Sequence, residues 1–262
     1  MPRSSSPAPS GTDLRAPVEA EGRFSTGIAD FDRVLGGGYR RGTVTLFRAD
    51  ESVGTEDLDL LLFPTLLSML YRSRGLVAVL PSRDSPHAFR SRLTRFVTRR
   101  RFDSRVRICD YVGEDAEAPY VVPLGPRGFP RRGRTPSAKE QAAGLAKMLA
   151  AERAARGTGG RPFVELTAFE VFETLLGAET ALPLFYHGIK RTRELGNLGL
   201  GILGPGLGVE AGIRRMVDSE IELRREDVGL VVRGVRPAFS SHVATIDPDR
   251  GAPHVTFTPR PA

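Results

Sequence analysis

A β-branched strand, a short polar turn and an apolar helix follow one another over residues 43–58. This order is typical of a phosphate-binding loop, G-x-x-x-x-G-K-[ST], in which backbone N–H groups and the Lys hold phosphates while the hydroxyl holds magnesium. In this chain Ala49 stands at the first Gly position, and the second Gly is kept as Gly54. Thr55 stands at the Lys position and Glu56 at the hydroxyl position. The sequence therefore predicts the architecture of a phosphate-binding loop and argues against its chemistry.

Acidic residues crowd this turn. Five of them fall within ten residues: Asp50, Glu51, Glu56, Asp57 and Asp59. At an effective dielectric constant of ~20, one carboxylate about 4 Å from a phosphate oxygen costs roughly 4 kcal/mol before screening by salt. In the first turn of a helix, however, each carboxylate stabilises the helix by about 0.3–1 kcal/mol. We therefore expect a loop capped by its own carboxylates, with neither ATP nor magnesium as a cofactor; nucleotide binding by an unusual route is the alternative.

Hydrophobic periodicity predicts strands alternating with helices, and then several closely spaced strands near the C-terminus. The expected strands cover residues 43–47, 75–80, 105–112, 161–166, 198–203, 219–223, 229–235, 243–246 and 254–258. The expected helices cover residues 23–35, 58–72, 85–100, 137–156, 169–176, 181–195 and 209–216. Continuous apolar runs such as 75–80 are typical of parallel strands that are covered on both faces. The pattern predicts an α/β sandwich of three layers, with a mostly parallel central sheet and an antiparallel C-terminal extension.

Composition divides the chain into one domain with tails. Residues 1–22, rich in Ser, Pro and Ala, read as a disordered tail, and residues 260–262 as a second, short tail. Residues 23–259 form the expected single domain, interrupted by a mobile Arg-, Pro- and Gly-rich loop at 114–136. The start of the chain lacks the apolar core of a signal peptide, and no apolar run reaches the roughly 18 residues of a membrane span. With a single cysteine, Cys109, the expected location is the cytoplasm.

The stretch before the loop resembles the start of the RecA-like P-loop ATPase core, and in particular its KaiC/RadA branch. The residues that carry the resemblance, over about 25 positions, are Ser25-Thr26-Gly27-Ile28, Phe31-Asp32, Leu35-Gly36-Gly37-Gly38 and Arg41-Gly42-Thr43-Val44-Thr45-Leu46. The rest of the chain resembles the family only in the order of its elements. The resemblance implies a RecA-like fold with a degenerate Walker A motif, whose vestigial positions are Ala49, Gly54, Thr55 and Glu56.

The resemblance also implies positions for the other active-site residues of the family. The acid that activates the attacking water falls near Ser82-Arg83-Asp84, which leaves Asp84 as a shifted candidate. The Asp at the end of the next long central strand, which orients the metal, corresponds to Glu165. A basic residue on a late strand, which in ring-forming relatives reaches the neighbouring subunit's nucleotide, is matched loosely by Arg236 and less well by Arg233. We therefore expect no functioning catalytic residue, with Asp84 and Glu165 as vestiges.

The chain is basic, with a net charge of +7 and a pI near 10.1, and only Lys139, Lys147 and Lys190 among its 38 basic residues are lysines. A GC-rich genome would account for the excess of arginine but not for its clustering. One cluster contains Arg99, Arg100 and Arg101 with Arg105 and Arg107, and the other contains Arg127, Arg131, Arg132 and Arg134 beside Phe129. The second is similar to the mobile loops with which recombinases touch phosphate backbones. Both clusters are candidate surfaces for a nucleic acid or a protein partner.

Other site chemistry has no support. The four histidines, His87, His187, His242 and His254, form no metal-ligand spacing with Cys109, so we expect no metal site. The G-x-S-x-G, H-E-x-x-H and C-x-x-C motifs do not occur. The sequence favours a pseudoenzyme: a RecA/KaiC-like module that regulates or scaffolds a protein partner, such as an active paralogue, or forms a homo-oligomer. The alternatives are a nucleic-acid-binding recombination or repair accessory protein and a residual ATPase completed by a partner in trans.

Overall fold

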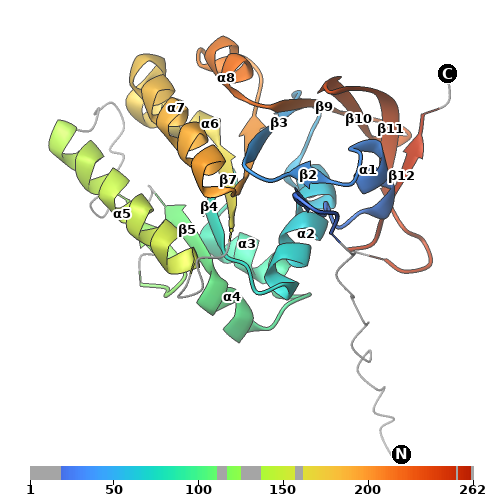
Figure 1. Ribbon diagram of the computed structural model, residues 1–262, viewed down its shortest axis with the longest axis horizontal. Helices are drawn as coiled ribbons and strands as arrows, with labels where there is room; N and C mark the ends of the chain where they lie inside the picture. The colour runs from blue at the N-terminus through green and yellow to red at the C-terminus, as the bar shows by residue number, and fades with distance from the viewer. Residues whose placement is uncertain (1–18, 111–116, 125–136, 157–161, 252, 261–262) are drawn as a thin grey trace, which may run out of the picture.

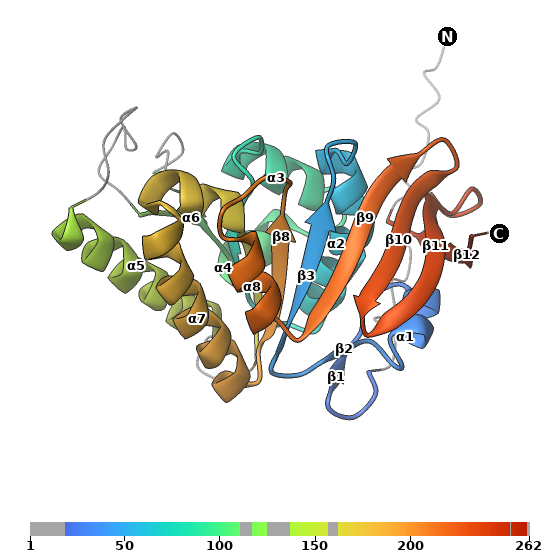
Figure 2. The same ribbon diagram turned by 90° about the horizontal axis from the view of Figure 1, so that it is seen from above.

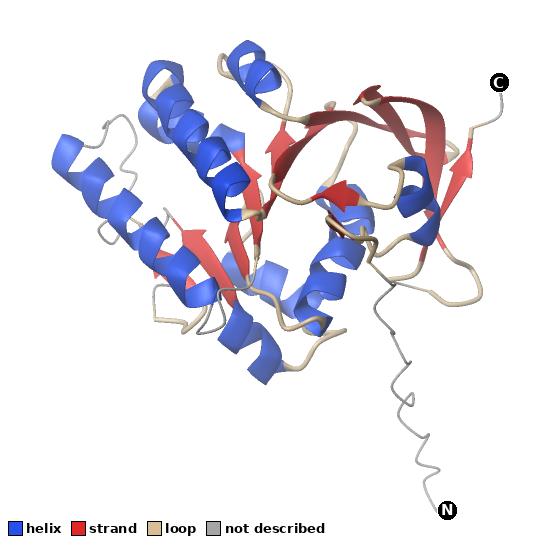
Figure 3. Ribbon diagram, viewed as in Figure 1, coloured by secondary structure: helices blue, strands red, loops and turns tan. Residues whose placement is uncertain are grey.

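The computed structural model describes residues 19–110, 117–124, 137–156, 162–251 and 253–260. A ten-stranded sheet forms its middle layer, with helices on both faces, and a separate two-stranded sheet lies beside one of its central strands (Figures 1 and 3). None of the described helices is long and apolar enough to cross a membrane.

The large sheet has the strand order β12-β11-β10-β9-β3-β8-β7-β4-β5-β6. Neighbours from β9 to β6 pair in parallel, and β9 to β12 pair antiparallel. Its strands are β3 (Thr43–Ala49), β4 (Leu76–Val79), β5 (Val106–Asp110), β6 (Val121–Pro123), β7 (Val164–Ala168), β8 (Leu198–Leu203), β9 (Ser219–Glu226), β10 (Gly229–Arg236), β11 (Ala238–Ile246) and β12 (Val255–Pro259). The small sheet pairs β1 (Arg23–Phe24) with β2 (Tyr39–Arg40). The predicted α/β sandwich with an antiparallel C-terminal extension is confirmed.

The helices divide between the two faces of the sheet, as Figure 2 shows. One face is covered by α1 (Ala29–Val34), α2 (Thr55–Tyr71), α3 (Pro86–Leu93) and α4 (Arg99–Arg105). The other is covered by α5 (Ala138–Arg156), α6 (Phe169–Leu176), α7 (Ala178–Leu195) and α8 (Glu210–Met216). Each layer of helices encloses its own apolar core, because the parallel strands present apolar side chains to both sides.

Helix α2, which begins at the predicted loop, is buried from Leu61 to Leu70 on every side. The antiparallel strands β10 to β12 curve around it (Figure 1), and α2 contacts both β11 and β12. Helix α1 closes the remaining side, where Phe31 packs on Phe257 of β12 with ring centroids 4.6 Å apart. A helix enclosed in this way is apolar all round, which explains why α2 shows no amphipathic stripe.

The segment before α1 makes a tight turn against α2. The hydroxyl of Ser25 and the N–H of Thr26 both donate to the Asp32 carboxylate, each at 2.6 Å. The Thr65 hydroxyl of α2 donates to the carbonyl of Thr26 at 2.8 Å. Gly27, with φ near 80°, lies so close to α2 that a Cβ there would be 2.3 Å from the carbonyl oxygen of Pro64. The family-like motif thus anchors the start of the domain to the central helix.

Several expected boundaries are wrong. The helix expected over 85–100 is two helices, because the chain leaves α3 after Leu93 and the Thr98 hydroxyl caps a new helix by accepting from the N–H of Arg101 at 3.2 Å. The strand expected over 161–166 runs instead from Val164 to Ala168. Within the loop expected at 114–136, Val121–Pro123 forms β6 beside β5; residues 114–116 and 125–136 lie outside the described residues. Of the expected N-terminal tail, residues 1–18 also lie outside them.

Candidate functional site

The predicted phosphate loop has the expected backbone path. Strand β3 ends at Ala49, residues 50–53 form the turn, and Gly54 precedes the first residue of α2, Thr55. The N–H of Gly54 donates to the carboxylate of Asp57 at 2.9 Å. In a phosphate-binding loop, N–H groups at this place point at the ligand. Here a side chain of the same helix accepts the hydrogen bond.

Two arginines of β9 reach the same loop. Arg225 donates to the second Asp57 oxygen at 2.8 Å, and Arg224 to Asp50 at 3.2 Å. The backbone N–H of Arg225 donates to the Ser52 hydroxyl at 2.9 Å, and that hydroxyl donates to Asp50. The acids of the turn are therefore matched by cations from the neighbouring strand. Of the five predicted, Asp50 and Asp57 pair in this way, while Glu51 and Glu56 are exposed.

Asp84, the candidate catalytic acid, faces Arg92 of α3. The guanidinium Nη1 and Nη2 donate to the two Asp84 oxygens at 3.0 and 2.6 Å, while Nε donates to Asp59 of α2 at 2.7 Å. The Asp84 side chain is 5% exposed. Burial raises the pKa of Asp59 to about 7, against the opposing effect of Arg92. A carboxylate held bidentately by an arginine is a poor general base, because proton uptake would break both charge-assisted hydrogen bonds.

Glu165 lies away from this site. It is the second residue of β7 rather than its last, and its side chain points to the face covered by α5 to α7. The Thr192 hydroxyl donates to Glu165 Oε2 at 2.7 Å and the Asn197 amide to Oε1 at 2.8 Å. Burial raises the pKa of Glu165 to about 7, with Glu152 adding to the effect. Thr167, two residues further on, is nearer the carboxyl end of β7, where the resemblance had placed Glu165.

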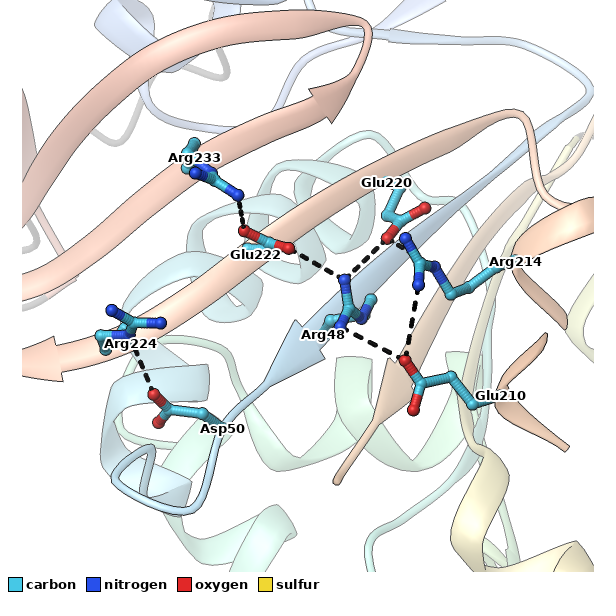
Figure 4. A network of polar contacts seen from close by, with 8 residues as sticks. All are labelled: Arg48, Asp50, Glu210, Arg214, Glu220, Glu222, Arg224 and Arg233. Atoms are coloured by element: carbon cyan, nitrogen blue, oxygen red, sulfur yellow. Dashed lines mark hydrogen bonds and ion pairs between the residues drawn. The ribbon is translucent and has the colours of Figure 1, made fainter. Parts of the chain in front are cut away.

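A charged network covers β3, β9 and α8 beside the loop (Figure 4). Arg48 lies at its centre, with ion pairs to Glu220 at 3.0 Å, Glu222 at 2.9 Å and Glu210 at 3.3 Å. Arg214 also pairs with Glu220, and Arg233 with Glu222. Sequence reasoning missed this network, although alternating charges at 220, 222 and 224 would have indicated one charged strand face.

The arginines singled out from the sequence lie in three places. Arg236 ends β10 and donates to the carbonyls of Arg214 and Val217 at 2.7 and 2.8 Å, which ties it to α8. Arg99, Arg100 and Arg101 begin α4; the first two are exposed, and the guanidinium of Arg101 lies 5.5 Å from the ring centre of Tyr71. Arg127, Arg131, Arg132 and Arg134 lie outside the described residues.

Within the described ranges, no three His, Cys, Asp or Glu side chains are grouped so as to hold a metal ion. Cys109 is buried in β5, and burial raises the pKa of its thiol to about 12. A thiol in that state is a poor nucleophile, because the thiolate is the reactive form.

The sequence of this chain matches one protein-family model and two curated proteins. A protein-family model described as GvpD basic region 2 matches residues 16–116. Two curated relatives come from Halobacterium salinarum: Protein GvpD2 is 24% identical over 241 residues, or 90% of this chain, and Protein GvpD1 is 27% identical over 145 residues, or 55% of this chain. The aligned regions make up 46% and 27% of those relatives, so the chain spans less than half of their length.

Two solved structures from Pyrococcus horikoshii share the architecture. The KaiC-like protein PH0186 has a TM-score of 0.57 at 11% identity, with 90% of this chain and 99% of that one covered. The uncharacterized protein PH0321, in complex with an unknown peptide, has a TM-score of 0.60 at 12% identity, with 91% and 100% covered. With the sheet order and the strand–turn–helix at its centre, these likenesses show that the chain has the RecA/KaiC-like fold.

Proposed function

We propose that this chain is a non-catalytic RecA/KaiC-like module that acts in the cytoplasm by binding and regulating, or scaffolding, a protein partner. The observation that carries the proposal is the Asp57 carboxylate on the Gly54 N–H, at the place where such a loop would hold phosphate. Arg225 completes this internal ion pair. The Gly54 N–H and the Arg225 guanidinium thus both have the Asp57 carboxylate as their partner.

One contact and one position in the fold further support the loss of catalysis. Arg92 engages both oxygens of Asp84, the one acid near the expected place of the catalytic base. Glu165 lies on the far face of the sheet from α2. The partner would be a protein, such as an active paralogue docked on the ring-forming surface that the resemblance implies.

The purified chain should neither bind nor hydrolyse ATP. Titration calorimetry with MgATP should give no heat of binding up to millimolar nucleotide, and phosphate release should stay at background. The expectation follows from the missing Lys and from the Asp57 carboxylate, which accepts the hydrogen bond of the Gly54 N–H in the place of a phosphate. Micromolar binding would contradict the proposal, and hydrolysis appearing only with an added partner would favour a residual ATPase completed in trans.

Restoring the loop tests whether Asp57 is the obstacle. The triple variant Ala49→Gly, Thr55→Lys, Glu56→Thr should still fail to bind ATP, because Asp57 continues to occupy the Gly54 N–H. Adding Asp57→Ala should free that donor and bring measurable ATP binding. The single Asp57→Ala variant is the matched control. It should show no ATP binding, since it lacks the Lys.

A nucleic-acid-binding role is the second candidate, favoured by the exposed Arg99 and Arg100 at the start of α4. Neither makes an ion pair with a residue in the part of the chain described above. Fluorescence anisotropy with single- and double-stranded DNA across a salt series would test it. Under the favoured proposal, affinity is weak and insensitive to salt. Under the second, Arg99→Gln with Arg100→Gln should lower affinity and reduce the salt slope by about two.

A further inference from the structure

A cavity of about 670 Å³ lies between helices α5, α6 and α7 and the sheet face that they cover. Figure 1 shows α5 and α7 on the same side of β7, with α6 beside α7. Small-molecule sites typically measure about 300–1,000 Å³. The cavity is therefore large enough for a small organic ligand. It is separate from the phosphate-type loop, whose helix α2 packs on the opposite face.

The sheet beneath the cavity includes Val44 of β3 and two glycines over which side chains pack closely: a Cβ on Gly199 would be 2.7 Å from Val44, and a Cβ on Gly201 would be 2.4 Å from Phe169. Strand β7 contributes Glu165 and Thr167, and β8 contributes Gly199 and Gly201. A strand covered on both faces normally carries apolar side chains at such positions. The walls, by contrast, are apolar and include Leu145 and Met148 from α5, Phe172 and Leu176 from α6, and Leu184 and Ile189 from α7.

Glu165 is the charged residue that the sheet contributes to the cavity. Its two oxygens accept hydrogen bonds from Thr192 and Asn197, which are both neutral. A carboxylate offers about four acceptor positions, so two remain. In the described part of the chain no Arg, Lys or His forms an ion pair with it; Arg191, which is paired with Glu152, acts on it only as a more distant positive charge. A half-buried carboxylate without a directly paired cation is costly, and a cation brought by a ligand would relieve that cost.

The other charged groups that line the cavity include more carboxylates than cations. They are Glu140 and Glu152 from α5 and His187, Lys190, Arg191 and Glu194 from α7. Arg191 pairs with Glu152 at 2.8 Å, and Lys190 with Glu194 at 3.8 Å. Glu140 accepts from the N–H of Ser137 at 2.8 Å. Since both cations already have carboxylate partners, the lining favours a ligand of positive charge.

We propose that this cavity binds an amphiphilic organic cation, whose ammonium or guanidinium group meets Glu165 and whose apolar body lies between the walls from α5, α6 and α7. An anion would face an excess of carboxylates. A neutral molecule of the same shape would gain the apolar contacts but not the charge-assisted hydrogen bond, which is roughly twice as strong as a neutral one.

Three probes of one chain length test the proposal: n-octylammonium, 1-octanol and octanoate, titrated calorimetrically into the full chain at pH 8. Octylammonium should bind about tenfold more tightly than octanol, and octanoate should not bind measurably. On lowering the pH to 6, octylammonium should weaken several-fold while octanol stays unchanged. Glu165, whose pKa is about 7, takes up a proton in this range, whereas an alkylammonium with a pKa near about 10.4 keeps its charge.

Two variants locate the site. Glu165→Gln should reduce octylammonium binding to the level of octanol, and Glu179→Gln, an exposed change at the start of α7 outside the cavity, should leave it unaltered. Gly188 lines the cavity at an exposed position of α7 where a Cβ would meet no atom within 4 Å, so Gly188→Phe should fold and, by narrowing the opening, weaken the binding of the probes. Equal affinity for octanol and octylammonium in the natural chain, or octylammonium binding unchanged by Glu165→Gln, would overturn the proposal.

Discussion

Gly27→Ala should lower the free energy of unfolding by about 2–5 kcal/mol, as measured by urea denaturation. The residue has φ near 80°, where an L side chain costs about 1–2 kcal/mol. The new Cβ would also lie 2.3 Å from the carbonyl oxygen of Pro64 in α2. Because α2 is buried on every side here, it cannot shift to relieve this contact. Relief requires a shift of the backbone, and such overpacking costs about 1–3 kcal/mol more.

Gly196→Ala is the matched control for this substitution. Gly196 ends α7 in the left-handed conformation, with φ near 64°, but a Cβ there meets no atom within 4 Å. It should cost only the conformational strain, about 1–2 kcal/mol. Equal losses at the two positions would mean that close packing of the 25–28 turn on α2 contributes nothing to stability.

Arg92→Met should destabilise the domain by about 3–5 kcal/mol at pH 8, because it leaves the buried carboxylates of Asp59 and Asp84 without their shared cation. Burial already raises the pKa of Asp59, and without the opposing effect of Arg92 its folded-state pKa rises further above the unfolded value. The contribution of Asp59 to stability is then present at low pH and lost as the pH rises through the folded pKa. Denaturation curves should show the variant approaching the natural chain towards pH 5.

Two companions make the Arg92 result specific. Asp59→Asn and Asp84→Asn, combined with Arg92→Met, should recover much of the lost stability at pH 8, since no buried charge remains. Arg33→Met removes an arginine from an exposed pair with Asp30 and should change stability by less than about 1 kcal/mol. A loss that is the same at pH 5 and pH 8 would show that packing of the arginine on Phe63, rather than its charge, is what matters.

The order of elements could be predicted because apolar periodicity and turn residues are local properties of the sequence. The loop at 49–57 was found for the same reason. The partners of its acids could not be predicted, because Arg224 and Arg225 lie more than 160 positions away and reach the loop only through the parallel pairing of β3 with β9. Glu165 was expected near the carboxyl end of its strand because the strand was predicted to end at residue 166. The strand β7 ends two residues later, at Ala168, so Glu165 lies near its start.

The break between α3 and α4 was missed for a different reason. Phe89, Leu93, Phe96 and Val97 repeat at helical spacing, so periodicity continued through the turn. The competing signal was the Thr98 side chain, whose hydroxyl favours the start of a helix over its interior. The Arg48 network was equally hidden, since cross-strand charge pairs depend on strand register.

The contact between Phe31 and Phe257 joins elements at opposite ends of the domain. During synthesis, helix α2 would emerge early but would lack the strands that cover it until nearly the whole domain had left the ribosome. Until then, its apolar surface would be exposed to other proteins in the cell. Folding that waits for such distant contacts is slow and open to aggregation. Loss of β12 should therefore affect the first helix as strongly as the last strands.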